Sequence, residues 1–164
     1  MISSPNSHDM QSGDIQQLLL SAEAICLQRG VRLTHLRRRV LEIIWEHQSP
    51  LGAYAILNRL CSDDGRMGAP PTVYRALDFL LEHGLIHRLA SLNTFIGCRQ
   101  PSHEHIGQFL VCRDCGRVDE LNNPMVEEAL HAEVIARRYE VLAQTVEIVG
   151  RCPCCQQEAI QDAN

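Results

Sequence analysis

The sequence contains no lysine, and all 15 of its basic residues are arginine. Arginine's planar guanidinium suits bidentate recognition of phosphates and guanine edges. Genomic base composition explains the same bias equally well, so both interpretations stay open. The chain also has no run of about 18 apolar residues, which excludes a membrane-spanning helix. Residues 1–13 are polar and include no apolar signal-peptide segment, which predicts a cytoplasmic protein.

The eight cysteines are interpreted in the light of that compartment. Disulfides are rare in a reducing cytoplasm, so metal ligands or free thiols are favoured over a pair of disulfides. Four cysteines form two Cys-x-x-Cys pairs, Cys112 with Cys115 and Cys152 with Cys155. Two such pairs provide the tetrahedral set that Zn²⁺ prefers, which predicts a structural zinc site. Cys154 makes the second pair ambiguous, but the spacing favours Cys152 and Cys155.

The net charge of −5 is unevenly distributed. Residues 1–92 contain nine arginines and nine acidic residues, whereas residues 93–164 contain six arginines and eleven acidic residues. Five arginines of the first part follow one another without an intervening acid: Arg29, Arg32, Arg37, Arg38 and Arg39. A basic cluster on a neutral half, beside an acidic half, predicts nucleic-acid binding by the N-terminal half alone.

The first half has the pattern of four helices followed by a hairpin. Apolar residues recur at helical spacing, Thr34 can cap the second helix, and glycines such as Gly30 and Gly84 can end helices. Short strands are predicted at 85–89 and 93–98. This order of elements predicts a winged helix-turn-helix.

The second half has a different pattern. Strands are predicted at 108–112 and 117–121, around the first cysteine pair, followed by a helix that starts at Asn123-Pro124 and a long strand at 140–149. A domain of about 70 residues buries too little apolar surface to be comfortably stable alone. Structural zinc can add about 10–16 kcal/mol of apparent binding free energy to folding, and dimerisation would add more.

The predicted fold class is therefore α+β, with an N-terminal winged helix-turn-helix DNA-binding domain and a small C-terminal α/β dimerisation domain that contains a Cys₄ zinc site. No internal repeat or low-complexity segment is present. The predicted divisions are a disordered leader (1–13), the winged-helix domain (14–89), a hinge (90–93), the dimerisation and metal-binding domain (94–158) and a tail (159–164).

The fourth helix has the features of a recognition helix. We expect Thr72 to cap it, with Val73, Leu77 and Leu80 on the buried stripe. Tyr74 and Arg75 then face outward in its first turn, the part of a recognition helix that enters the major groove. An arginine there can contact guanine O6 and N7, which is worth about 1–3 kcal/mol of discrimination. The alternative is a solvated surface arginine beside a half-buried tyrosine.

The segments Gly30-Val31-Arg32-Leu33-Thr34 with Arg37, Pro71–Leu77 and the two cysteine pairs resemble the ferric uptake regulator superfamily over residues 15–158. Pro70–Leu80 together with Cys98 is most similar to its zinc uptake regulator branch. The resemblance implies a homodimeric, metal-dependent repressor that binds an AT-rich palindromic operator in double-stranded DNA, and it implies that Tyr54 and Arg75 contact DNA. With the basic cluster and the recognition segment, the predicted DNA-binding set is Arg32, Arg37, Tyr54, Thr72, Tyr74 and Arg75.

A metal-dependent regulator needs a second, sensing metal site, and candidate ligands lie between the two halves. His87, Cys98, His105 and Glu120 correspond to the sensing ligands of the zinc branch, and His103 can substitute for a neighbour. A thiolate with imidazole and carboxylate ligands suits tetrahedral zinc, so we expect two zinc ions per protomer. One ion bound by both halves would clamp the hinge and fix the recognition helices at half-site spacing. Gln144 replaces a histidine of many superfamily members, which argues against a third site.

The leading interpretation is a zinc-responsive repressor of zinc uptake genes that uses no small-molecule substrate. Iron or peroxide sensing is the alternative within the superfamily, but the Cys98 thiol favours zinc. A zinc hydrolase is the alternative from another class. It is disfavoured because the sequence has no His-Glu-x-x-His pair, and four protein ligands leave no open position for water.

Overall fold

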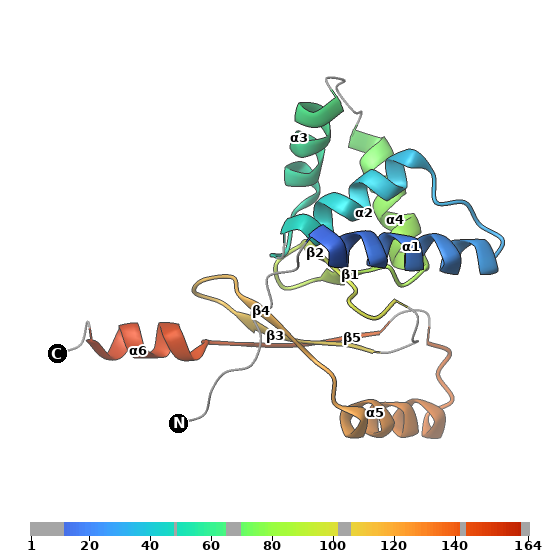
Figure 1. Ribbon diagram of the computed structural model, residues 1–164. Coiled ribbons are helices and arrows are strands. Elements are labelled where there is room, and N and C mark those ends of the chain that lie inside the picture. Colours follow the sequence, from blue (N-terminus) through green and yellow to red (C-terminus); the bar gives the residue numbers. More distant parts are fainter. Residues whose placement is uncertain (1–11, 48, 65–69, 102–105, 142–143, 162–164) are drawn as a thin grey trace.

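The computed structural model describes residues 12–47, 49–64, 70–101, 106–141 and 144–161 (Figure 1). In chain order the elements are α1 (Ser12–Gln28), α2 (His35–His47), α3 (Ala53–Asp64), α4 (Pro70–Glu82), β1 (Ile86–Leu89), β2 (Thr94–Gly97), β3 (Gly107–Cys112), β4 (Val118–Leu121), α5 (Pro124–Ala136), β5 (Thr145–Gly150) and α6 (Pro153–Gln161). Figure 1 shows α1–α4 gathered above the β1–β2 hairpin, with the second sheet beneath them. The predicted α+β class and winged helix-turn-helix are confirmed.

Glycines end two of the four N-terminal helices. Gly30 has φ +69°, its N–H bonds the Leu27 carbonyl, and the N–H of Val31 bonds the Cys26 carbonyl. This pairing is the Schellman motif, which satisfies carbonyls that the helix end leaves free. Gly84, with φ +64°, ends α4 in the same way. The predicted stops at Gly30 and Gly84 are confirmed.

The core of the N-terminal domain is formed around α2. Its buried residues are Val40, Leu41, Ile43, Ile44 and Trp45, and they pack against the inner faces of α1, α3 and α4. Thr34 precedes the helix and its carbonyl accepts the N–H of Arg38, as expected at an N-cap position.

The fourth helix begins earlier than predicted. It includes Pro70 and Pro71, so Thr72 lies inside its first turn and is not the N-cap. Proline is tolerated there because the first N–H groups of a helix have no intrahelical partner, and its fixed φ suits a helix. The predicted inward stripe is confirmed, since Val73, Leu77 and Leu80 are buried.

The wing is an antiparallel hairpin of β1 and β2, in which Leu89 pairs with Thr94. Residues 90–93 are the turn of this hairpin, and Asn93 there has φ +51°. The predicted hinge at 90–93 therefore separates two paired strands, which a hinge between domains cannot do. Leu51 also bridges to Phe95, and the Trp45 indole N–H donates to the Cys98 carbonyl at 3.2 Å. We place the connection between domains after Cys98.

The C-terminal sheet has the strand order β4-β3-β5, with β3 antiparallel to β4 and parallel to β5. Helix α5 begins as predicted, with the Asn123 side chain accepting the N–H of Met125 at 3.0 Å. The strand predicted at 140–149 is shorter and starts at Thr145. Helix α6 was not predicted; Pro153 stands at its first position, where proline favours a helix start.

The wing packs on one face of this sheet. Leu89 forms a buried cluster with Phe109 and Val111 of β3, and Leu92, Ile96 and Val118 pack against it. This cluster joins the two domains through the hairpin rather than through the helices. Within the described ranges, no helix is long and apolar enough to cross a membrane.

Candidate metal centre and nucleic-acid interface

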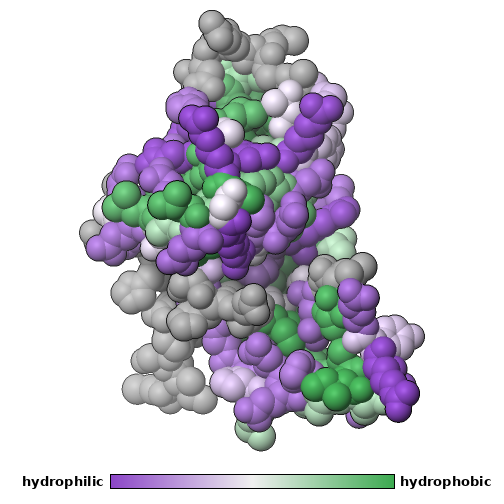
Figure 2. All heavy atoms as spheres, turned by 90° about the vertical axis from the view of Figure 1, so that its right-hand side faces the viewer, coloured by the Kyte–Doolittle hydropathy of each residue, from purple (hydrophilic) through white to green (hydrophobic). Residues whose placement is uncertain are grey.

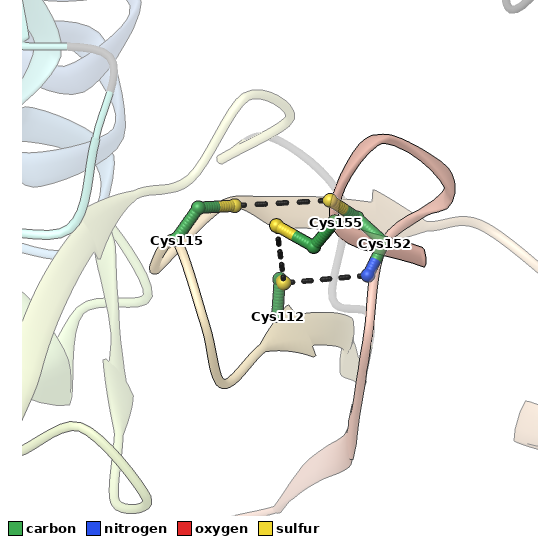
Figure 3. Close-up of side chains that lie close together, drawn as sticks. All are labelled: Cys112, Cys115, Cys152 and Cys155. Carbon is green, nitrogen blue, oxygen red and sulfur yellow. Dashed lines mark hydrogen bonds between the residues drawn. The ribbon is translucent and has the colours of Figure 1, made fainter. Parts of the chain in front are cut away.

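The first cysteine pair lies on a tight turn between β3 and β4. The N–H of Gly116 bonds the Cys112 carbonyl at 2.9 Å, and the N–H of Cys112 bonds the Arg117 carbonyl at 2.8 Å. Gly116 adopts φ +72°, which a residue with a side chain reaches only at a cost. The turn aims both thiols to the same side of the chain (Figure 3).

The second pair reaches the first because β5 runs parallel to β3. The register pairs Cys112 with Gly150, so both strands deliver their following residues to the same edge. The N–H of Cys152 donates to the Cys112 Sγ at 3.3 Å. Cys152 immediately precedes α6, and Cys155 lies in its first turn. An ion pair between Arg151 and Asp114, at 2.8 Å, also joins the two turns.

The four Sγ atoms lie within 4.8 Å of one another. The Cys112–Cys155 and Cys115–Cys152 separations are 3.9 and 3.7 Å. Sulfurs at the corners of a zinc tetrahedron are about 3.8 Å apart, given a Zn–S bond of about 2.3 Å. A disulfide bond is about 2.0 Å long, so the disulfide alternative is excluded. The cluster fits zinc, and the exposed Cys154 lies outside it, as the spacing predicted.

Backbone N–H groups also prepare the cluster for a cation. The N–H of Cys115 and that of Cys152 lower the pKa of Cys112 to about 6. A thiolate is the form that binds metal, so these N–H groups favour the ligand form of Cys112, whereas hydrogen bonds with neighbouring thiols raise the pKa of Cys155.

Cys98, the predicted soft ligand of the sensing site, is held rigidly in the N-terminal domain. Its side chain is fully buried, and its N–H bonds the Leu85 carbonyl at 3.0 Å while its carbonyl accepts from Trp45. Burial raises the pKa of Cys98 to about 12, and the charge of Glu120 contributes. A thiol in this state needs a cation nearby to ionise at neutral pH.

Glu120 and His87 reach the same junction from opposite sides. The register pairs Glu120 with Phe109, on the sheet face that the wing covers. The His87 ring lies edge-on to the Phe109 ring, with centroids 5.3 Å apart. Gly107 packs beneath this imidazole, because a Cβ there would lie 2.8 Å from His87 Nδ1. Sequence reasoning missed the role of Gly107, which only the close approach reveals.

The convergence of the sensing set is less complete than that of the cysteines. Over the ranges that the structure describes, only the four cysteines bring three or more His, Cys, Asp or Glu ligand atoms close enough for one ion. His87, Cys98 and Glu120 lie at the junction without meeting that condition. The predicted His103 and His105 lie outside the described residues.

The predicted DNA-contacting tyrosines lie together. Tyr54, at the start of α3, is 72% exposed, and Tyr74, on α4, is 47% exposed. Both line a hollow of about 270 Å³ between these helices and the wing. Thr72 and Arg75 are exposed on the first turns of α4, which places them outward as expected. Arg88 of the wing lines the same hollow; strand alternation could have revealed it, since the neighbouring Leu89 is buried.

The basic cluster is more neutralised than the sequence suggested. Arg38 bonds Glu23 of α1 and Arg39 bonds Glu42, each at 2.8 Å. Arg37 stacks over the Phe79 ring at 3.6 Å and donates to the carbonyl of Arg32. A guanidinium held on an aromatic face is oriented by that contact, so Arg37 has a structural role that the sequence prediction missed. Arg32 is exposed.

The other face of the C-terminal sheet is apolar and open. Leu110 and Ile148 pair across β3 and β5 and are 39% and 54% exposed. Helix α5 buries none of its residues, and Met125, Val126 and Ile135 are exposed on it. Figure 2 shows apolar side chains gathered in the lower part of the molecule. Leu110 and Ile148 are neighbours on this face, and exposed apolar surface of this kind is typical of interaction sites.

Comparisons with known proteins agree on one family. The model of the ferric uptake regulator family matches residues 28–149. The zinc uptake regulation protein of Escherichia coli is 36% identical over 149 residues, which span 89% of this chain and 85% of that protein. A solved zinc uptake regulator complexed with zinc and DNA superposes with a TM-score of 0.80 at 34% identity, covering 92% of this chain and 99% of that one.

One further relative, XcZur, was solved in two states. Its holo form gives a TM-score of 0.74 at 38% identity and covers 86% of this chain and 98% of that one. Its apo form gives a TM-score of 0.51 at 37% identity and covers 88% of this chain and 99% of that one. Identity and coverage are nearly equal in the two comparisons, so the difference in TM-score reflects a difference in conformation between the two forms.

Proposed function

The chain belongs to the ferric uptake regulator family, and we propose that it is a zinc-responsive transcriptional repressor that controls zinc uptake genes. The observation that carries this proposal is the similarity, across both domains, to a regulator solved with zinc and DNA. The recognition helix and the Cys₄ cluster lie in separate domains joined by the wing, so metal chemistry in one can act on DNA binding by the other.

We assign the structural zinc to Cys112, Cys115, Cys152 and Cys155. Bound zinc would supply four metal–thiolate bonds that join the end of β3 to the start of α6. The N–H groups of Cys115 and Cys152 hold the Cys112 sulfur in place and favour its anionic form. These residues build a closed site with no position for a substrate, as expected of a structural centre. The relatives are named as uptake regulators, which agrees with a protein that is not an enzyme.

We assign a second, sensing zinc site to His87, Cys98 and Glu120 with His105, or His103 in its place. Cys98 is fixed to the winged-helix core, whereas Glu120 belongs to the C-terminal sheet. A cation bound by both would therefore favour the conformer in which the wing lies against the sheet. The described conformer is closer to holo than to apo XcZur, which supports its identification with the DNA-competent state.

We propose that DNA is contacted by Tyr54, Tyr74 and Arg75, with Thr72 and Arg32 on the same domain. Arg88 is added because it lines the hollow shared by the two tyrosines. Arg37 is withdrawn as a direct contact, since Phe79 and the Arg32 carbonyl hold it.

We propose that the protein acts as a homodimer formed through the C-terminal domain. Leu110 and Ile148 on the open sheet face, with the unburied apolar residues of α5, are the surface that a second copy would cover. Two recognition helices related by a two-fold axis would then contact the two halves of a palindrome.

The test is a zinc titration of protein that retains its structural metal, read by the fluorescence anisotropy of a labelled promoter duplex from a zinc uptake gene. We expect zinc-dependent binding in the parent. Arg75→Ala is expected to weaken binding to this duplex more than to random DNA, without loss of zinc. Cys98→Ser is expected to keep the structural zinc but to bind DNA only at much higher zinc, because serine supplies no thiolate. Zinc-independent binding in the parent would contradict the proposal.

A further inference from the structure

A single carboxylate of the C-terminal sheet holds the turn of the wing. The Ala90 N–H donates to Glu147 Oε1 at 2.6 Å, and the Ser91 N–H donates to Glu147 Oε2 at 3.1 Å. The Ser91 hydroxyl also donates to Oε2. Three donors from two adjacent residues therefore converge on one side chain that lies 56 positions or more away in the sequence.

The contact depends on negative charge. Successive backbone N–H groups that point to one place form an anion-binding concavity, and hydrogen bonds to an ionised acceptor are about twice as strong as neutral ones. Partial burial opposes ionisation of Glu147, but the bonds from Ser91 and Ala90 outweigh it and lower its pKa. A neutral amide at this position offers one acceptor oxygen in place of two.

Glu147 links the strand that leads into the zinc cluster to the wing turn beside the proposed DNA-binding surface. On β5 it pairs with Phe109, which packs against Leu89 of the wing, and the same strand leads into the second cysteine turn. On the other side, the turn that it holds contains Asn93, whose Oδ1 accepts from Arg88 at 3.1 Å. Arg88 lines the hollow with Tyr54 and Tyr74.

We propose that Glu147 is a positioning residue that latches the wing to the C-terminal sheet and presets the DNA-competent orientation without using any metal ligand. The inference rests on the proposed function, because the orientation that it sets is the one assigned to DNA binding. The latch and the sensing site favour the same conformer, so each lowers the free energy that the other must supply. Losing the latch raises the zinc concentration needed for DNA binding while leaving the number of bound ions unchanged.

The first arm of the test observes the latch directly, in zinc-loaded full-length protein without DNA. Amide hydrogen exchange of Ala90 and Ser91 is compared among the parent, Glu147→Gln, Ser91→Ala and Glu140→Gln. Glu140→Gln is the matched control, because it removes the same charge from an exposed residue of the same domain. We expect faster exchange in Glu147→Gln, a smaller increase at Ala90 in Ser91→Ala, and parent-like exchange in the control.

The second arm measures the zinc midpoint, which is the zinc concentration at half-maximal binding of the promoter duplex. Zinc content and the urea midpoint of unfolding, read by the fluorescence of the single tryptophan Trp45, are measured beside it. We expect Glu147→Gln to raise the zinc midpoint by about fivefold or more, the usual scale of coupling between sites. Ser91→Ala is expected to raise it less, because two of the three bonds remain. Zinc content and the Trp45 midpoint are expected to match those of the parent, which a variant with a damaged fold would not show.

The outcomes separate the latch from the function on which it rests. Unchanged exchange at Ala90 and Ser91, or an unchanged zinc midpoint in Glu147→Gln, overturns the latch. Equal shifts in Glu147→Gln and Glu140→Gln also overturn it, because they point to net charge. A parent that binds the duplex regardless of zinc overturns the proposed function. In that case hydrogen exchange at Ala90 and Ser91 alone tests whether Glu147 holds the wing turn.

Discussion

The two domains of this protein are stabilised by different means. In the described ranges, the N-terminal domain has a buried apolar cluster of twenty residues drawn from α1 to α4 and the wing. The corresponding cluster of the C-terminal domain has three buried residues, and one of them, Leu89, belongs to the wing. The C-terminal domain instead contains the four converging cysteines and an open apolar face.

This difference teaches how a small domain can serve as a metal-dependent element. A domain with a large core folds whether or not an ion is bound, since burial of apolar surface supplies its stability. A domain with a small core depends on groups that are added to it, namely metal, partner and neighbouring domain. This division agrees with the proposed roles, in which the N-terminal domain reads DNA and the C-terminal domain binds structural zinc and a second copy.

The largest expected effect is loss of the structural metal. Cys115→Ser removes one of four thiolates, so most of the apparent zinc binding free energy, about 10–16 kcal/mol for structural sites, is lost to the C-terminal domain. We expect zinc content to fall and this domain to unfold. The fluorescence of Trp45, the single tryptophan, reports the N-terminal domain and is expected to keep its urea midpoint within a small shift.

Cys154→Ser is the matched control for that experiment. Cys154 is exposed and lies beside two of the ligands, yet it is outside the cluster. It should retain zinc and dimerise like the parent. A Cys115→Ser protein with full zinc content would show that the cluster is not the structural site.

The second largest expected effect is loss of dimerisation through the open face of the C-terminal sheet. Ile148→Asp places a carboxylate on the open sheet face, and taking such a charge out of water costs several kcal/mol. We expect sedimentation to show monomers at concentrations where the parent is dimeric. Leu27→Asp provides the comparison, because Leu27 is 80% exposed on α1 of the other domain. If Ile148→Asp stays dimeric and Leu27→Asp does not, the interface lies on the N-terminal domain.

A substitution in the N-terminal core should destabilise the N-terminal domain and leave the zinc site intact, which is the reverse of the effect expected for Cys115→Ser. Leu80→Ala removes a fully buried side chain of α4, which typically costs about 2–5 kcal/mol. We expect a lower Trp45 urea midpoint and unchanged retention of zinc under chelation. Leu20→Ala, at a largely exposed position of α1, is expected to change neither. Zinc loss in Leu80→Ala would show that the domains unfold as one unit.

The sequence predicted the first five helices and the four cysteine ligands well, because helical periodicity and Cys-x-x-Cys spacing are local signals. It did not show that parallel pairing of β3 with β5 brings the two cysteine pairs together. Gly30 and Gly84 end helices at the expected residues, and the Cys-x-x-Cys turns need only neighbouring atoms. What it missed depends on pairing between distant segments. The hinge prediction at 90–93 conflicted with the strands predicted on both sides of it, and the pairing of β1 with β2 makes these residues a hairpin turn. The stacking of Arg37 on Phe79 is a contact between distant residues that local spacing does not reveal. Glu147 gave no sequence signal, since its donors lie in the other domain.

The smallest expected effect tests the comparison at the level of single helices. Asn123 caps α5, a helix with no buried residues, whereas Thr34 stands at the N-cap position of α2, which has five. An N-cap substitution to alanine costs about 1 kcal/mol in either place. In α2 the buried face holds the helix regardless, so Thr34→Ala should change amide exchange only in the first turn. In α5 local signals supply more of the stability, so Asn123→Ala should speed exchange along the whole helix. Asn122→Ala, one residue earlier in the same loop, should leave α5 unchanged. Equal and local effects in Asn123→Ala and Thr34→Ala would mean that α5 is held by packing after all, as it would be if a partner subunit covered it.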